Sequence, residues 1–298
     1  MHSTGSFLLT VIERVRAYLD EATLDAKYTN DYLVRHVISP EMVSVMARLS
    51  NSFSNPIRLR HSVTLATDTE HYILPPNIGE IYRVAVMDVN NRVTQEMMPN
   101  NEFHPRGPNW QIQGNMLSFR PLPTQGETVD IHYIPNGDFQ PHYSTNGGAL
   151  DSTKKIFTFA STPTLGDRDT RENSYAGAML RVWHDNGLLE ERVVESYNAT
   201  TREATVRIAF STSASDSTLK YEVAPAGMNS LYQAIACACA MNLGTARNIT
   251  QKQMNYITLQ YKMAMKTVGD NLSNMQARTG KAYDKRTTDN SAHLILGD

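Results

Sequence analysis

Residues 71–88 read HYILPPNIGEIYRVAVMD and carry a strong strand signal. Their two apolar runs, residues 72–74 and 81–87, are short, and Pro75-Pro76-Asn77 separates them. Short apolar runs that end at proline, glycine or asparagine are typical of strands joined by turns. The segment therefore predicts antiparallel β-structure, and the same pattern continues on both sides of it.

Outward from this segment, a period of two begins near residue 58 and returns in short runs up to about residue 225. Gln113-Gly114-Asn115 predicts a tight hairpin turn, because glycine and asparagine tolerate a positive φ. Residues 136–148 and 225–227 are rich in turn-forming residues, so they are interpreted as loops at the ends of an insertion. We expect an antiparallel β domain over 58–138 and an inserted β module over 139–225. The other predicted strands are 110–112, 116–119, 128–134, 156–159, 178–183, 191–197, 204–210 and 220–223.

Both ends of the chain show a helical period instead. Residues 7–19 carry one apolar stripe, a second helix is expected from Asn30, and a third from Ser39-Pro40. Near the other end, residues 231–243 and 250–272 form two more stripes. Because an amphipathic helix is not stable alone in water, the stripes are expected to pack together. The predicted fold class is α+β: a helical bundle from both chain ends, with an antiparallel β-sheet or sandwich region inserted between them. N-terminal helices occupy 1–57, C-terminal helices 226–275, and a polar tail 276–298.

Composition excludes several classes of protein. The chain has 298 residues and a net charge of −2, from 28 Lys+Arg against 30 Asp+Glu. A hydrophobic content of 41% supports a folded core and excludes global disorder. Near-zero net charge argues against a dedicated nucleic-acid binder. No run approaches the ~18 apolar residues that a membrane span needs, so no membrane association is expected.

Signatures of catalysis are absent from the sequence. It contains no Gly-x-Ser-x-Gly, His-Glu-x-x-His, Gly-x-x-x-x-Gly-Lys or Gly-x-Gly-x-x-Gly pattern. Cys237 and Cys239 are two residues apart, which places their thiols on different sides of a helix. They are predicted to be small buried residues rather than metal ligands. We therefore expect no catalytic residue, cofactor or metal.

Charge is distributed unevenly along the chain. Residues 61–250 carry 14 basic and 20 acidic groups, whereas residues 251–286 carry seven basic groups against Asp270 and Asp284, a net of +5. This segment is either a solvated helix face or a basic arm that contacts an acidic protein surface or passes near DNA phosphates. No aromatic platform accompanies it, so reading of bases is not expected. The candidate partner-interface residues are Lys252, Lys262, Lys266, Arg278, Lys281, Lys285 and Arg286.

Several segments resemble one known family. VIERVRAYLDEA at 11–22 and YTNDYLVRHVISPEMVSVMARLS at 28–50 are followed by the strand segment at 71–88, GNMLSFRPLP at 114–123 and VDIHYIPNGD at 129–138. With the C-terminal helical pair, this arrangement resembles head-to-tail adaptor proteins (head completion or connector proteins) of tailed bacteriophages. The resemblance covers residues 1–138 and 226–275.

The resemblance implies a structural virion protein with no enzymatic activity. Its copies, commonly twelve, would form a ring that binds the portal protein and leads into the nozzle or tube of the tail. The ring would continue the channel through which genomic DNA passes without sequence-specific contact. The expected location is the neck of the virion, which is assembled in the host cytoplasm.

A second function stays open at this point: a β-sandwich glycan-binding or tail-fibre-type module on a helical stalk. That function would require exposed aromatic side chains in the β region, and Trp110, Tyr133, Tyr143 and Trp183 are the candidates. The usual burial of such residues favours a place in the core. An enzyme of unrecognised type is a third possibility.

Overall fold

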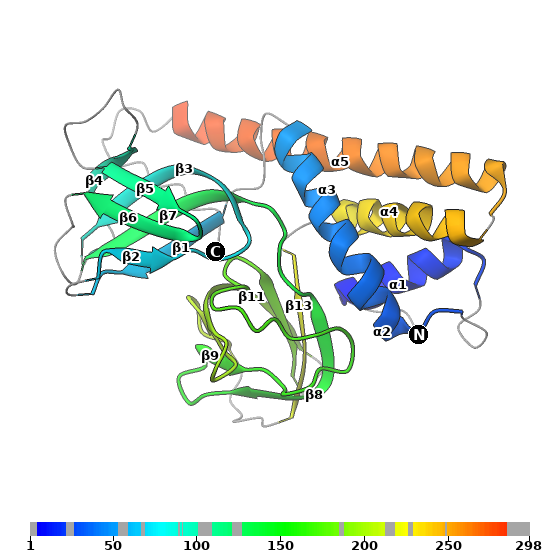
Figure 1. The fold of residues 1–298 in the computed structure, drawn as a ribbon, viewed down its shortest axis with the longest axis horizontal. Helices are drawn as coiled ribbons and strands as arrows, with labels where there is room; N and C mark the ends of the chain where they lie inside the picture. Colours follow the sequence, from blue (N-terminus) through cyan, green and yellow to red (C-terminus); the bar gives the residue numbers. More distant parts are fainter. Residues whose placement is uncertain are drawn as a thin grey trace. The chain divides into compact units, whose positions relative to one another are not determined.

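A computed structural model gives the fold (Figure 1) and describes residues 5–21, 27–52, 59–66, 69–88, 90, 92–100, 109–120, 127–184, 188–211, 218–225, 229–247 and 249–284. The chain divides into two compact units: residues 1–57 with 227–298, and residues 58–226. The first unit contains α1 (Phe7–Tyr18), α2 (Asn30–Leu33), the π-helical turn η1 (Val34–Ile38), α3 (Ser39–Ser52), α4 (Asn229–Arg247) and α5 (Gln251–Asp284).

In the helical unit, α4 lies between helices from both ends of the chain. Ser6 caps α1 by accepting a hydrogen bond from the Leu9 amide at 3.2 Å. The buried face of α1 packs on α4, where the Phe7 ring meets the Tyr232 ring edge-on at 4.8 Å between centroids. The other side of α4 packs along α5 (Figure 1).

Residues 30–52 form one continuous helical segment, which differs from the predicted restart at Ser39. Thr29 is the N-cap, and its hydroxyl accepts from the Tyr32 amide at 3.1 Å. Ser39 has helical backbone angles (φ −58°, ψ −53°), so it lies within the helical segment and does not start a new helix. Pro40 has no N–H to donate in the helix interior. The π-helical turn immediately before it changes the hydrogen-bond register there, which allows the segment to stay helical past the proline.

The second unit begins with a seven-stranded sheet in the order β1-β7-β3-β4-β5-β6-β2. Its pairs are antiparallel except β4–β5, which is parallel at Met98 and Asn109. The predicted hairpin is confirmed: Gly114, at φ +64°, lies in the turn between β5 and β6. The strands are β1 (Leu59–Thr64), β2 (His71–Ile73), β3 (Ile78–Met87), β4 (Val93–Pro99), β5 (Asn109–Gln113), β6 (Met116–Arg120) and β7 (Thr128–Pro135).

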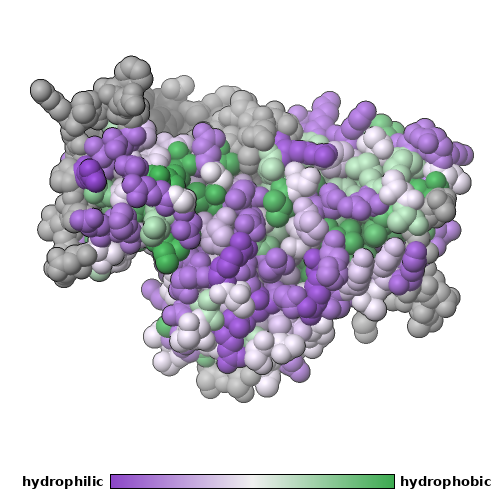
Figure 2. Space-filling view, viewed as in Figure 1, coloured by the Kyte–Doolittle hydropathy of each residue, from purple (hydrophilic) through white to green (hydrophobic). Residues whose placement is uncertain are grey.

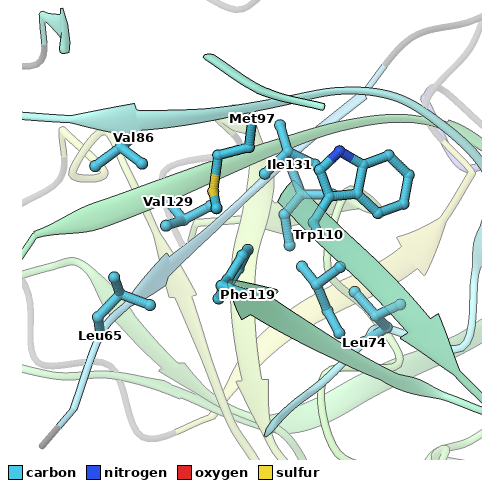
Figure 3. Close-up of a cluster of buried hydrophobic side chains, with 10 residues drawn as sticks. Leu65, Leu74, Val86, Met97, Trp110, Phe119, Val129 and Ile131 are labelled. Carbon is cyan, nitrogen blue, oxygen red and sulfur yellow. The ribbon is translucent and has the colours of Figure 1, made fainter. Parts of the chain in front are cut away.

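The core of this sheet is a cluster of buried apolar side chains (Figure 3). The members come from both halves of the sheet, so they hold β1, β3 and β7 against β5 and β6. Burial of aliphatic and aromatic area at about 25 cal/mol per Å² is the main stabilising contribution here. The cluster comprises Leu65, Leu74, Val84, Val86, Met97, Trp110, Leu117, Phe119, Val129 and Ile131.

Six further strands close into a barrel in the order β10-β11-β12-β9-β8-β13. Register shifts at Val194/Ser196 and at Leu219/Tyr221 bend the strands, as closure requires. Aromatic rings fill the interior, including Phe159 stacked on Tyr221 at 5.3 Å. The strands are β8 (His142–Leu150), β9 (Ile156–Thr158), β10 (Met179–Trp183), β11 (Leu189–Asn198), β12 (Glu203–Val206) and β13 (Leu219–Ala224).

The predicted fold class is therefore wrong. Instead of a helical bundle with one inserted sheet or sandwich region, the described chain is mostly β in its elements: thirteen strands in two barrel-like sheets, against five α-helices and the π-helical turn. A period of two identifies strands but not the strands that they pair with. The sequence therefore did not predict that six of the strands close into a barrel. In addition, β8 occupies part of the segment 136–148 that was interpreted as a loop. Gly147 (φ +80°) and Gly148 bend this strand and let it approach the barrel's aromatic rings.

Buried hydrogen bonds join the sheet to the barrel inside the second unit. The Ala176 carbonyl accepts from the Asn77 amide nitrogen at 2.6 Å and from the Tyr133 hydroxyl at 3.1 Å. Next to it, Gly177 (φ +81°) lies so close to Leu59 that a Cβ would stand 2.6 Å from the leucine side chain. Removing the module 139–225 would leave the fully buried Tyr133 hydroxyl without this acceptor, which is costly.

Candidate protein interface on helix α5

Helix α5 has 34 residues and is about 50 Å long, and one of its faces packs inside the helical unit. Ile257, Ala264 and Val268 on that face are buried. Ile257 belongs to a cluster with Cys237 and Ala240 of α4. This buried face accounts for one set of apolar residues at spacings of three and four along the helix.

The opposite face of α5 carries three exposed apolar side chains, which we call the apolar strip: Tyr256, Leu259 and Met263. Their exposed fractions are 55%, 55% and 56%. Spacings of three and four residues place all three along one line of the helix. Figure 2 shows apolar residues lying among hydrophilic ones on the surface that α5 contributes. Large apolar side chains grouped on a surface mark a contact site for another molecule.

Charged side chains border the apolar strip. Lys252 lies in line with it at one end, Asp270 in line at the other end, and Lys266 beside Met263; all three are exposed. Lys262 is also exposed, about 80° around the helix from the axis of the strip. An apolar centre with a charged rim is the usual anatomy of a protein–protein contact.

The structure places three of the seven predicted interface residues, Lys252, Lys262 and Lys266, around this strip. Arg278 and Lys281 belong to α5, which continues to Asp284 rather than giving way to a tail at 276. Their side chains, and all of Lys285 and Arg286, lie outside the described residues. Sequence reasoning found the lysines and missed the strip. The signal was present, because residues 256, 259 and 263 recur at helical spacing opposite the predicted core face.

Both cysteines are buried, as predicted from their spacing and surroundings. Burial raises the pKa of the Cys237 thiol, which lies 3.7 Å from the Gln233 amide nitrogen. Burial also holds the pKa of Cys239 well above its usual value. Both thiols are therefore protonated at neutral pH. No group of three metal-ligating side chains occurs among the described residues.

The aromatic residues named for glycan binding do not form an exposed platform. Trp110, Tyr133 and Tyr143 are buried, with exposed fractions of 9%, 0% and 6%. Trp183 is half-buried, and the Lys220 ammonium lies 4.7 Å from its ring centroid. A sugar could stack on that face of the indole only by displacing the lysine.

A cleft of about 210 Å³ opens where β4 leaves β3 for β5. Its lining includes Tyr82, Met98 and Trp110, together with Arg83 and Glu96, which form an ion pair at 2.5 Å. Ligand pockets usually measure about 300–1,000 Å³. The cleft is thus smaller than a typical ligand site, and α5 provides the more extensive candidate surface.

No protein-family model matches the chain, and no curated protein is significantly similar to it. None of the helices in the described part of the chain combines the length and the apolar character needed to cross a bilayer.

Proposed function

We propose that this protein is a structural component of a tailed-bacteriophage particle, a head-to-tail adaptor. Its copies form a ring between the portal protein and the tail, and the ring continues the DNA channel. The observation that carries the proposal is the apolar strip of α5 with its lysine border. The resemblance of residues 1–138 and 226–275 to adaptor proteins gives that surface its proposed role.

A protein neighbour fits this surface better than DNA does. The lysines alone do not distinguish DNA from a protein partner, because phosphates and acidic side chains both attract them. The exposed side chains of Leu259 and Met263 gain nothing from phosphates, but they gain by burial against another protein. In a ring the lysines recur in every copy, so a modest local charge becomes a belt that attracts an acidic portal or tail surface.

Replacing Met263 by glutamate should weaken binding to the proposed portal partner by at least about tenfold, because a charge would have to be buried in the contact. Ile208→Glu is the matched control, since Ile208 is an exposed apolar residue of the β unit (44% exposed). Binding is measured by surface plasmon resonance on immobilised portal assemblies. Portal affinity that is the same for wild type, Met263→Glu and Ile208→Glu would refute a role for the strip.

A further inference from the structure

The apolar strip and its charged neighbours on α5 are spaced symmetrically along the helix. Three pairs lie at equal distances from residue 261: Lys252 with Asp270, Tyr256 with Lys266, and Leu259 with Met263. The outer pair is 18 residues apart, which is about five full helical turns, so both charges lie on the line of the strip. All six side chains are exposed.

We propose that in the free protein a second copy covers this surface, with the two α5 helices antiparallel about a two-fold axis near residue 261. Lys252 then faces the partner subunit's Asp270, and the same ion pair recurs at the other end. Leu259 packs against the partner subunit's Met263 in the centre. The Tyr256 ring lies under the ammonium of the partner subunit's Lys266.

Charge selects this orientation over the parallel one. In a parallel pair Lys252 would face the partner's Lys252, and Asp270 would face the partner's Asp270, which is repulsive at both ends. The antiparallel pair replaces two repulsions by two attractions and keeps the apolar side chains in contact. An isologous contact of this kind closes at two copies.

One helix pair buries less than the roughly 1,200 Å² that specific, stable complexes need. The dimer is therefore weak, and its population rises with concentration in the micromolar range. Because the dimer uses the same strip as the proposed portal contact, dimerisation and assembly compete. The inference concerns this protein alone, so it can fail without the proposed adaptor role failing.

Sedimentation velocity over a concentration series tests the pairing. Wild type should move from monomer to dimer as concentration rises. Lys252→Asp and Asp270→Lys should each lower the association constant on the order of tenfold, because each makes both ends repulsive. An equimolar mixture of the two variants should dimerise like wild type, since the heterodimer has opposite charges at both ends.

Lys155→Asp is the control, because it makes the same change of charge at an exposed lysine outside α5. Its dimerisation should match that of wild type. Circular dichroism checks that each variant keeps its helical content. A monomeric wild type at every concentration, or a variant mixture that stays monomeric, would overturn the proposal.

Discussion

Lowering the pH from 7 to 4 should remove about 6 kcal/mol of folding free energy from the β unit, through two buried histidines. His61 of β1 has an exposed fraction of 3%, and its Nδ1 lies 3.3 Å from the Glu195 carbonyl oxygen. His142 of β8 is fully buried, and its Nδ1 lies 3.1 Å from the Tyr175 hydroxyl. Burial, which disfavours the charged imidazolium, lowers the pKa of each to about 4.

The sign follows from these depressed values. The unfolded chain takes up protons near the ordinary histidine pKa of about 6.5, whereas the folded chain takes them up only near pH 4. Their contribution is thus complete above pH 6.5 and is lost as the pH falls to 4. A difference of 6.5 − 4 = 2.5 pH units at about 1.4 kcal/mol per unit gives about 3 kcal/mol per histidine.

Urea unfolding between pH 7 and 4 measures this loss. In the double variant His61→Gln, His142→Phe the free energy of unfolding should depend on pH much less steeply than in wild type. His71→Gln is the control, because His71 is exposed. Equal pH dependence in the double variant and wild type would show that these imidazoles are not the groups that titrate.

Replacing Arg181 by alanine should destabilise the barrel by about 3–5 kcal/mol. Arg181 of β10 lies in register between Glu191 of β11 and Glu222 of β13. Its guanidinium is 2.5 Å from the Glu191 carboxylate and 3.3 Å from that of Glu222. Glu222 is fully buried, so removal of the cation takes away the guanidinium that faces this carboxylate in the interior.

Chemical denaturation of two further variants tests whether the loss comes from the buried ion pair. Arg83→Ala removes an ion pair whose side chains are 37% and 55% exposed, and it should cost at most about 1 kcal/mol. The double variant Arg181→Met, Glu222→Met removes both buried charges and should regain much of the lost stability. A loss for Arg181→Ala no larger than that for Arg83→Ala would contradict this role of the buried pair.

Local signals in the sequence account for part of this fold. The turn at Gly114 follows from the conformational freedom of glycine between two alternating runs. Strand β8 was missed because Gly147 and Gly148, which suggest a loop, here serve a bend and a close approach to aromatic rings. The contact between Asn77 and Ala176 joins residues 99 positions apart, so no local pattern could reveal it. Barrel closure depends on such distant pairings.

The candidate interface was predictable to a similar extent. Net charge over 251–286 pointed to Lys252, Lys262 and Lys266, because charge adds along a segment whatever its fold. The apolar strip required knowing which face of α5 packs on α4. Periodicity assigned Ile257 and Val268 to the core correctly, but it could not show that Leu259 and Met263 stay exposed on the other side of the helix.

The proposed adaptor role depends on a ring whose copies make protein contacts through α5. Cryo-electron microscopy of the purified protein mixed with the proposed portal partner tests this. We expect a closed ring of identical copies on the portal, with Leu259 and Met263 buried at a protein contact in each copy. A protein that leaves the portal bare, or a ring in which the apolar strip faces solvent, would contradict the proposal.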